Sequence, residues 1–232
     1  MIRLTRRAVV AGGVGLLAGC TRPRGREHLL YRDDFTRGLG QWLVEAETPG
    51  RISAQDGVLD IAVPAGATLW FRPLLEGPVA IDYVVTPVSD GGDWDQVSDV
   101  NAFWMATDPR APGGDVLART RSGAFADYDE LRTYYVGIGG NRNTTSRLRR
   151  YIGQRDNRPL LPEHDRSGAG DLLAPNRPIR LRLIADGRRI AVERDGRALF
   201  ALDDATPYTR GHFGLRTTWS HLQVRDFKVW RL

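Results

Sequence analysis

Residues 179–201 read IRLRLIADGRRIAVERDGRALFA, and this stretch decides the fold class. Ile179, Leu181 and Leu183 alternate with other residues, which is the period of a strand with one buried face. An Asp-Gly pair follows each of the first two runs, and Asp-Gly between two such runs is a strong hairpin signal. The stretch therefore predicts three antiparallel strands, at 179–185, 189–194 and 197–201.

Short segments of the same kind recur along the chain, rich in β-branched and aromatic residues and separated by Gly, Pro, Asp and Asn. No long segment has the periodicity of an amphipathic helix. Many short strands with frequent turns are typical of an all-β sandwich or jelly roll. The further predicted strands are 29–31, 42–45, 51–54, 58–61, 68–71, 79–85, 102–106, 131–138, 146–151, 212–217 and 222–230.

The N-terminus has the pattern of a bacterial export signal. Three arginines precede a short apolar run that closes on Leu17-Ala18-Gly19-Cys20, and such a run is too short to span a bilayer. The Arg6-Arg7 pair suits twin-arginine export. We therefore predict a lipoprotein signal peptide over 1–19 and lipidation of Cys20.

The predicted mature protein is anchored in the bacterial cell membrane through Cys20 and faces the extracytoplasmic side. Residues 20–28 are expected to form a tether, and residues 29–232 one jelly-roll domain. Cys20 is the one cysteine of the chain, so its acylation would leave no thiol for disulfides, zinc binding or nucleophilic catalysis.

The charge balance argues against nucleic acid as a partner. The chain carries 33 basic residues (Lys and Arg) and 28 acidic ones, and three of the arginines lie in the predicted signal peptide. A mature protein with so small an excess of positive charge lacks the electrostatic footprint of a nucleic-acid-binding domain.

Segments at both ends of the chain resemble a known class of domains. They are Tyr31-Arg-Asp-Asp-Phe35, Gly57-Val-Leu-Asp-Ile61, Phe213-Gly-Leu-Arg216 and Val224-Arg-Asp-Phe-Lys-Val-Trp230. They are similar to the concanavalin A-like, laminin-G-like jelly rolls of secreted bacterial carbohydrate-active proteins. The resemblance implies a β-sandwich of two antiparallel sheets, with the first and last strands close together.

Five segments in the middle carry a more specific resemblance: Phe103-Trp-Met-Ala-Thr-Asp-Pro-Arg110, Phe125-Ala-Asp-Tyr128, Leu131-Arg-Thr-Tyr-Tyr-Val-Gly137, Gly140-Asn-Arg-Asn-Thr-Thr145 and Arg158-Pro-Leu-Leu-Pro-Glu-His-Asp165. They resemble the YesU-like bacterial family, domain of unknown function 6250, over roughly 29–232. This resemblance implies a role in polysaccharide use, but it supplies no reaction.

The region from 94 to 165 collects aromatic rings, amides and arginines where a packed core would need aliphatic residues. Sugars present apolar faces to aromatic rings and hydroxyl groups to amides and guanidinium groups. For each ring, the alternative is a place in the core, and for each arginine it is surface solvation. The expected substrate-binding residues are Trp104, Asn101, Tyr135, Asn141, Arg147, Arg150 and Trp219.

A lyase acting on an acidic polysaccharide is the leading expectation for activity. His164 or His221 would be the base, and Tyr134 would protonate the leaving oxygen. Arg132 and Asn143 would neutralise the uronate carboxylate. Each histidine has an alternative structural role, His164 as a loop-locking residue and His221 in a loop between the last two strands.

Two other roles remain open from the sequence. One is a glycoside hydrolase, although the paired carboxylates of such enzymes are not evident in the chain. The other is a non-catalytic carbohydrate-binding lipoprotein that assists glycan-degrading partner enzymes. In every case the expected partner is a polysaccharide or oligosaccharide.

No cofactor is expected, although a structural calcium ion is possible. Asp90, Asp93, Asp95 and Asp99 lie in one glycine-containing loop and could supply oxygen ligands. The alternative is that these aspartates hydrogen-bond to their own loop backbone. The ligand spacing of an EF-hand loop is missing.

Overall fold

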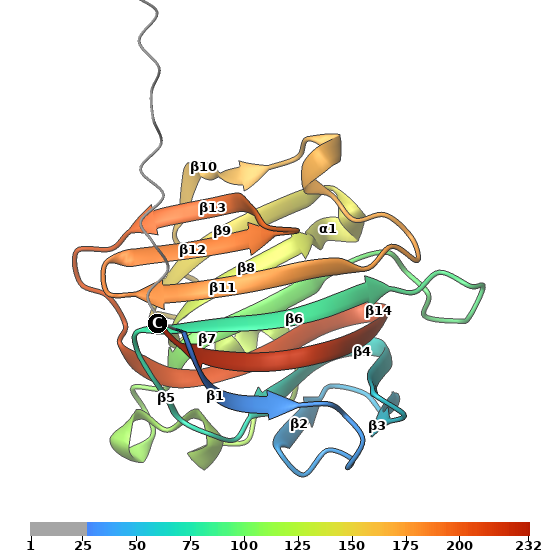
Figure 1. The fold of residues 1–232 in the computed structure, drawn as a ribbon, viewed down its shortest axis with the longest axis horizontal. Helices are drawn as coiled ribbons and strands as arrows, with labels where there is room; N and C mark the ends of the chain where they lie inside the picture. The colour runs from blue at the N-terminus through green and yellow to red at the C-terminus, as the bar shows by residue number, and fades with distance from the viewer. Residues whose placement is uncertain (1–26) are drawn as a thin grey trace, which may run out of the picture.

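The structure is a computed structural model that describes residues 27–232. The predicted signal peptide, Cys20 and most of the tether lie outside the described residues. Strands dominate the described part of the chain (Figure 1), which confirms the all-β prediction. Within residues 27–232, no helix has the length and apolar character needed to cross a membrane.

The strands are β1 (His28–Asp33), β2 (Trp42–Ala46), β3 (Arg51–Gln55), β4 (Val58–Phe71), β5 (Leu75–Glu76), β6 (Val79–Pro87), β7 (Val100–Thr107), β8 (Arg132–Gly139), β9 (Thr145–Ile152), β10 (Leu160–Arg166), β11 (Ile179–Asp186), β12 (Arg189–Arg194), β13 (Arg197–Asp203) and β14 (Arg210–Arg231). Helical turns form α1 (Gly140–Asn143) and the 3-10 segments Pro112–Gly114, Val116–Ala118, Phe125–Tyr128 and Ala169–Asp171.

The stretch that decides the fold class forms the predicted antiparallel strands. β11 pairs with β12, and β12 pairs with β13. The aliphatic residues of β11 at alternate positions are buried, as the two-residue period requires. Both Asp-Gly turns contain a glycine with positive φ, at Gly187 and Gly196.

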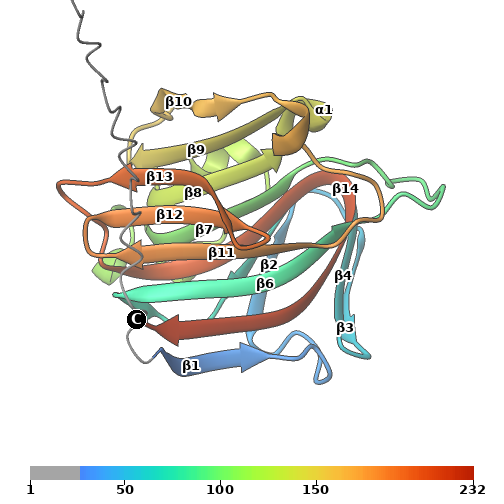
Figure 2. The ribbon, with the colours of Figure 1, turned by 45° about the horizontal axis from the view of Figure 1, so that its top comes forward.

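Two long strands, β4 and β14, join the layers of the sandwich. The first half of β14 lies between β7 and β4, where Gly214 pairs with Phe103 on one side and Trp70 on the other. The second half pairs with β6 on one side; on the other side it pairs with β4 as far as Val224 and with β1 from Phe227 to Arg231. One layer thus follows the order β10-β9-β8-β7-β14-β4-β2. The other follows β13-β12-β11-β6-β14, with β4 and β3 beyond one part of β14 and β1 beside its end (Figure 2).

β14 is one strand where the sequence predicted two. The register with β4 shifts between Thr218 and Ser220, and Trp219 at that point has a φ of 42°. Such a bulge bends a strand without ending its pairing. β1 pairs with the end of β14, which confirms that the first and last strands lie side by side.

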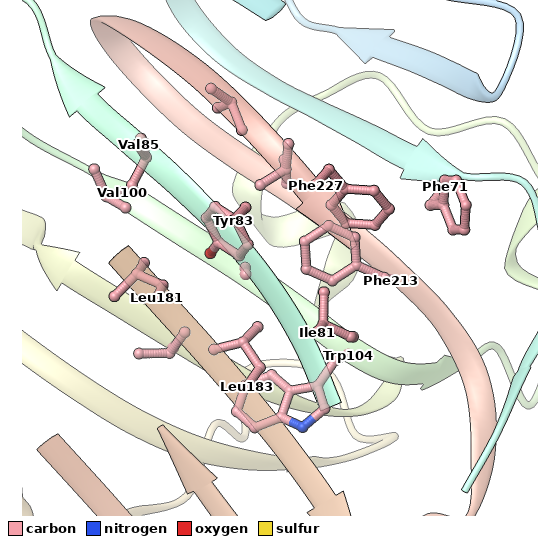
Figure 3. Close-up of a cluster of buried hydrophobic side chains, with 14 of the residues drawn as sticks. Phe71, Ile81, Tyr83, Val85, Val100, Trp104, Leu181, Leu183, Phe213 and Phe227 are labelled. Carbon is pink, nitrogen blue, oxygen red and sulfur yellow. The ribbon is translucent and has the colours of Figure 1, made fainter. Parts of the chain in front are cut away.

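The main core lies between the two layers (Figure 3). Tyr83, Leu181 and Leu183 reach it from one layer, and Trp104 and Tyr134 reach it from the other. The sites expected at Trp104 and Tyr134 are therefore wrong, because both side chains are fully buried between the layers. Their rings pack together with centroids 5.5 Å apart, so the core role, one of the alternatives considered for each ring, is the correct one.

Tyr134 has a structural role that can be measured. Its hydroxyl donates to Asp204 Oδ2 over 2.7 Å and accepts from the backbone N–H of Tyr208 over 2.9 Å. We expect Tyr134→Phe to lower the free energy of unfolding by about 1–3 kcal/mol, because both partners lose a buried hydrogen bond. Urea unfolding measures this cost, with the exposed Tyr31→Phe as control. Loss of saccharide binding at unchanged stability would contradict this role.

Candidate functional site

A pocket of about 490 Å³ opens on the outer face of the layer that holds β7, β8, β9 and β14. The floor consists of strand residues that point away from the core. Each of them is next in the chain to a core residue, and consecutive strand residues point to opposite faces. Arg216 of β14 pairs with Asn101 of β7, and Asn101 pairs with Gly137 of β8. In the next part of the floor, Tyr135 of β8 pairs with Arg149 of β9. Directly paired side chains on one face are close neighbours.

Gly137 lets two polar groups approach each other at the floor. A Cβ atom at this position would lie 2.7 Å from Tyr135 Oη and 2.9 Å from Asn101 Oδ1. Asn101 is only 4% exposed, and its amide donates to Asp99 Oδ1 over 3.1 Å. Its Oδ1 is buried without a hydrogen-bond partner. A buried acceptor without a partner is costly, and this oxygen lies beneath the pocket floor, closed off from solvent.

Five arginines line the pocket against two carboxylates. Arg147 binds Asp165 through two hydrogen bonds, and Arg158 lies 3.3 Å from Asp129. The pocket arginines are Arg142, Arg147, Arg149, Arg158 and Arg216, and the carboxylates are Glu47 and Asp99.

Arg149 differs from its paired neighbours. Its guanidinium donates to the carbonyl oxygen of Arg158, and no carboxylate within residues 27–232 forms an ion pair with it. Burial lowers the pKa of Arg149, and the charges of Arg147 and Arg158 lower it further. Among the residues that the structure describes, this cation on the pocket floor has no anionic partner.

Two acidic groups that line the pocket with Arg149 stay protonated more readily than usual. Burial raises the pKa of Asp99, although Ser98 and Asn101 donate hydrogen bonds to its carboxylate. Burial also raises the pKa of the Tyr135 phenol well above its usual value, and the nearby Tyr151 and Asp99 add to this effect. Tyr135 is thus a proton donor at neutral pH.

Trp219 forms the rim at the bulge of β14. Its side chain is 41% exposed, and the Arg142 guanidinium lies 5.5 Å from the ring centroid. Arg142 belongs to three consecutive left-handed residues in α1, with φ of 54° at Asn141, 58° at Arg142 and 60° at Asn143. Left-handed non-glycine residues cost about 1 kcal/mol or more each. Such strain clusters at functional sites, and here both strained segments border the pocket.

A family model described as Domain of unknown function (DUF6250) matches residues 61–227. This span holds every pocket residue except Glu47. The chain belongs to this family. Among curated proteins, none matches the chain in sequence.

Solved structures share the fold of this DUF6250 member at low sequence identity. A protein of unknown function with a galectin-like fold from Bacillus subtilis is 19% identical, with 87% of this chain and 95% of that chain covered and a TM-score of 0.66. The metal-free Emp46p carbohydrate recognition domain is 13% identical, with coverage of 86% and 95% and a TM-score of 0.60. An endo-beta-1,3-glucanase from Pyrococcus furiosus is 11% identical, with coverage of 88% and 94% and a TM-score of 0.58.

The DUF6250 pocket contains part of the predicted binding set. Missed by the prediction were Arg158 and Arg216, which come from separate parts of the chain, and Asp99, which was considered only as a calcium ligand. Arg149 was weighed as part of a basic group that could bind an anion, but it was not among the expected binding residues. Arg149 belongs to an arginine-rich run, Arg147 to Arg150, and strand alternation along this run puts Arg149 on one face with Arg147. The predicted residues that line the pocket are Asn101, Tyr135, Asn141, Arg147 and Trp219.

Three other expectations are corrected because the side chains lie outside the pocket. Arg150 binds Asp204 over 2.6 Å and lies over the ring of Tyr208. Asn143 exchanges hydrogen bonds with the backbone of Leu173, so its amide is already satisfied. Arg132 begins β8 with an exposed side chain outside the pocket lining.

The expectation for His164 as a base is also wrong. His164 lies on strand β10 and not in a loop, where the sequence analysis placed it. It is 4% exposed, its Nε2 is 2.9 Å from the carbonyl oxygen of Ala201, and its ring packs edge-on against Phe200. These contacts join β10 to β13, which is a structural role.

His221 is held between two carboxylates rather than aimed at a substrate. Its Nδ1 lies 2.8 Å from Asp95 Oδ1 and its Nε2 lies 3.0 Å from Asp60 Oδ2. Both ring nitrogens donate only when the imidazole is protonated. Asp95 also accepts from the backbone N–H groups of Asp90 and Gly92. This ion triad fastens the 90–99 loop, which carries part of the pocket rim, to β4 and β14.

The calcium site has no support in the described residues. Between residues 27 and 232, no group of three or more His, Cys, Asp or Glu side chains converges as metal ligands would. The Asp95 carboxylate is hydrogen-bonded to the loop backbone and to His221, and the Asp99 carboxylate is hydrogen-bonded to Ser98 and Asn101. Loop hydrogen bonding, the alternative considered for these aspartates, is what the structure shows for Asp95.

The triad predicts a dependence of stability on pH. Burial opposes ionisation of Asp60 and Asp95, but their hydrogen bonds and His221 lower both pKa values below 3.8. A carboxyl group whose pKa is lowered in the folded state stabilises the protein at pH values above its ordinary pKa of 3.8. This stabilisation is lost as the pH falls through the folded-state pKa values. We expect His221→Gln to flatten the decline of the melting temperature below about pH 4.

Thermal unfolding of wild type and His221→Gln from about pH 7 to pH 2 tests this expectation. The exposed His28→Gln is the control, because His28 lies at the start of β1. Acid limbs of identical steepness in all three proteins would show that the triad makes no linked contribution.

Proposed function

We propose that the pocket binds an acidic glycan, with a sugar carboxylate paired to Arg149. The observation that carries this proposal is the half-buried Arg149 charge without a carboxylate partner, on the floor of a pocket with five arginines. A guanidinium group binds a carboxylate through two parallel hydrogen bonds. The fold is compatible with such a role, since neighbours of the same fold include a carbohydrate recognition domain and a glucanase.

The other groups in the pocket suit the rest of a sugar ring. The exposed indole of Trp219 offers a face for the apolar side of a pyranose. Arg142 and Arg216 add positive charge at the rim and floor.

Trp219→Gly separates the binding role of this residue from its cost to stability. Glycine adopts a φ of 42° without strain, so we expect the free energy of unfolding to stay the same or rise by about 1 kcal/mol. Loss of the ring should weaken acidic oligosaccharide binding by about threefold to tenfold. Calorimetric titration and urea unfolding measure the two effects, with Trp219→Phe as the variant that keeps a ring. Unchanged affinity in Trp219→Gly would remove Trp219 from the site.

A uronate lyase is a second candidate, favoured by the presence of Asp99, Tyr135 and Arg149 in one pocket. Asp99 has a raised pKa and interacts with Tyr135, which suits a base paired with an acid. As carboxylate, Asp99 would take the proton next to the sugar carboxylate, and Arg149 would stabilise the enolate. The bond to the leaving oxygen would then break, with Tyr135 protonating that oxygen. This assignment replaces the histidine base expected from the sequence.

The test is calorimetric titration of the purified protein with acidic and matched neutral oligosaccharides, followed by mass spectrometry of each mixture. Binding of acidic members with unchanged masses supports the binding function. Unsaturated products that vanish in Asp99→Asn, while binding persists, support the lyase. Products with added water would instead indicate hydrolysis. Failure to bind any acidic member would contradict the proposed function.

We also propose that the protein is an exported lipoprotein that meets its ligand outside the cytoplasm. The support is the sequence ending at Cys20, and β1 begins at His28, shortly after it. Cys20→Ala should move the protein from the membrane fraction to the soluble fraction. Unchanged membrane association would contradict the anchor.

A further inference from the structure

A second arginine-lined pocket, of about 520 Å³, lies where β10 and β13 approach each other. Four guanidinium groups line it against only two carboxylates. Arg166 comes from β10, Arg177 precedes β11, and Arg194 and Arg197 flank the turn between β12 and β13. The carboxylates are Asp171 and Asp195.

Arg194 repeats the situation of Arg149 in the first pocket. Its side chain is 15% exposed, and its Nη1 donates to the carbonyl oxygen of Leu172 over 2.9 Å. The closest ion-pair contact to a carboxylate joins Nε to Asp195 Oδ2 over 3.9 Å. Burial lowers the pKa of Arg194, as it does for Arg149. Arg194 is therefore a second positive charge with no close counter-charge in the described part of the chain.

Two further arginines of this pocket have exposed side chains without an ion pair in the described chain. Arg177 and Arg197 are both exposed, and neither has a carboxylate oxygen within 4.0 Å among residues 27–232. Arg188, next to the same strands, instead holds Asp203 with two hydrogen bonds of 2.9 and 2.8 Å. Surface solvation alone does not explain why Arg188 has a carboxylate partner while Arg177 and Arg197 have none in that part of the chain. A shared anionic ligand for Arg177 and Arg197 would explain it.

The two pockets lie on opposite faces of one sheet edge. In the pairing of β9 with β10, Arg147 lies opposite Asp165 and Arg166 lies opposite Ser146. Consecutive strand residues point to opposite faces, so Arg147 lines the first pocket and Arg166 the second. β10 is the outermost strand of this layer (Figure 1), so a chain passing round it would meet both pockets.

We propose that the pocket between β10 and β13 is a second binding site for a carboxylate-bearing sugar of an acidic glycan. The ligand class rests on the proposed function, but the geometry of this pocket is independent of Arg149. A long polymer could occupy both sites, and the second contact would then benefit from a high effective concentration. A short oligosaccharide would bind each site separately.

Calorimetric titration of the full protein with a galacturonate trisaccharide tests the site. We expect two trisaccharides per wild-type protein and one per Arg177→Gln/Arg197→Gln double variant. Arg149→Gln should retain the second site and lose the first. For a long galacturonate polymer, the double variant should bind about tenfold more weakly than wild type. Arg188→Gln, which removes a paired charge nearby, should behave as wild type.

The outcomes separate this inference from the proposed function. One trisaccharide per wild-type protein, lost in Arg149→Gln and kept in the double variant, would overturn the second site and leave the proposed function intact. One trisaccharide lost in the double variant and kept in Arg149→Gln would support the second site and overturn the first. Equal polymer affinity in Arg188→Gln and the double variant would also count against the second site.

Discussion

Replacing Arg149 by glutamine is expected to weaken acidic oligosaccharide binding by about ten- to a hundredfold without lowering stability. The loss of a charge-assisted hydrogen bond costs about 1.5–3 kcal/mol, which corresponds to this range of affinity. Stability should persist because the folded state disfavours the Arg149 charge, whose pKa is lowered by burial and by neighbouring arginines.

Calorimetric titration and thermal unfolding of Arg149→Gln measure both effects. Arg149→Lys keeps a charge but loses the planar pair of donors, so its affinity should also fall. Arg188→Gln is the control, because Arg188 is exposed and paired with Asp203 outside the pocket. Wild-type affinity in Arg149→Gln would mean that another arginine holds the carboxylate.

Replacing Arg121 by alanine is expected to lower the free energy of unfolding by about 3–5 kcal/mol. The Arg121 side chain is 4% exposed, and its Nη2 donates to Asp108 Oδ2 over 2.6 Å. Its Nη1 lies 3.5 Å from Glu45 Oε1. Without Arg121, the buried negative charges of Asp108 and Glu45 would have less positive charge nearby to balance them.

The same guanidinium lies over the rings of Trp70 and Tyr128, which belong to the aromatic cluster that continues to Tyr135 on the pocket floor. We therefore expect the pocket to loosen as well. Urea unfolding gives the cost, and Arg119→Ala is the control because Arg119 is 49% exposed and 3.7 Å from Asp108. A cost below about 1 kcal/mol for Arg121→Ala would show that the cluster contributes no net stability.

Local sequence signals were sufficient where strands contain their own alternation and turns. The stretch 179–201 predicted β11, β12 and β13 because its aliphatic positions and Asp-Gly turns act over a few residues. β10 was missed because Leu160–Arg166 contains Pro162 and a polar run that gives no strand signal. Its backbone is extended because it pairs with β9, a partner that local sequence does not identify.

For the candidate site, too, local sequence predicted one part and the packing of distant segments decided the rest. Alternation in the predicted strand 131–138 puts Tyr134 and Tyr135 on opposite faces, but it does not say which face is inside. Tyr134 is internal because the second layer covers its face, where Asp204 and the backbone of Tyr208 satisfy its hydroxyl. Tyr135 remains at the pocket because only the 112–128 segment and its aromatic neighbours cover the outer face in part.

The sequence by itself determined the all-β class, the hairpins, the family and the set of residue types from which a glycan site can be built. The tertiary structure alone decided that Asn101, Tyr135, Arg149, Arg216 and Trp219 meet in one pocket, while both candidate histidines serve as structural ties. The physical reason is the separation along the chain over which each kind of interaction acts. Alternation and turn propensity act between neighbours in the chain, whereas burial and charge pairing depend on strands that are distant in sequence and adjacent in the sheet.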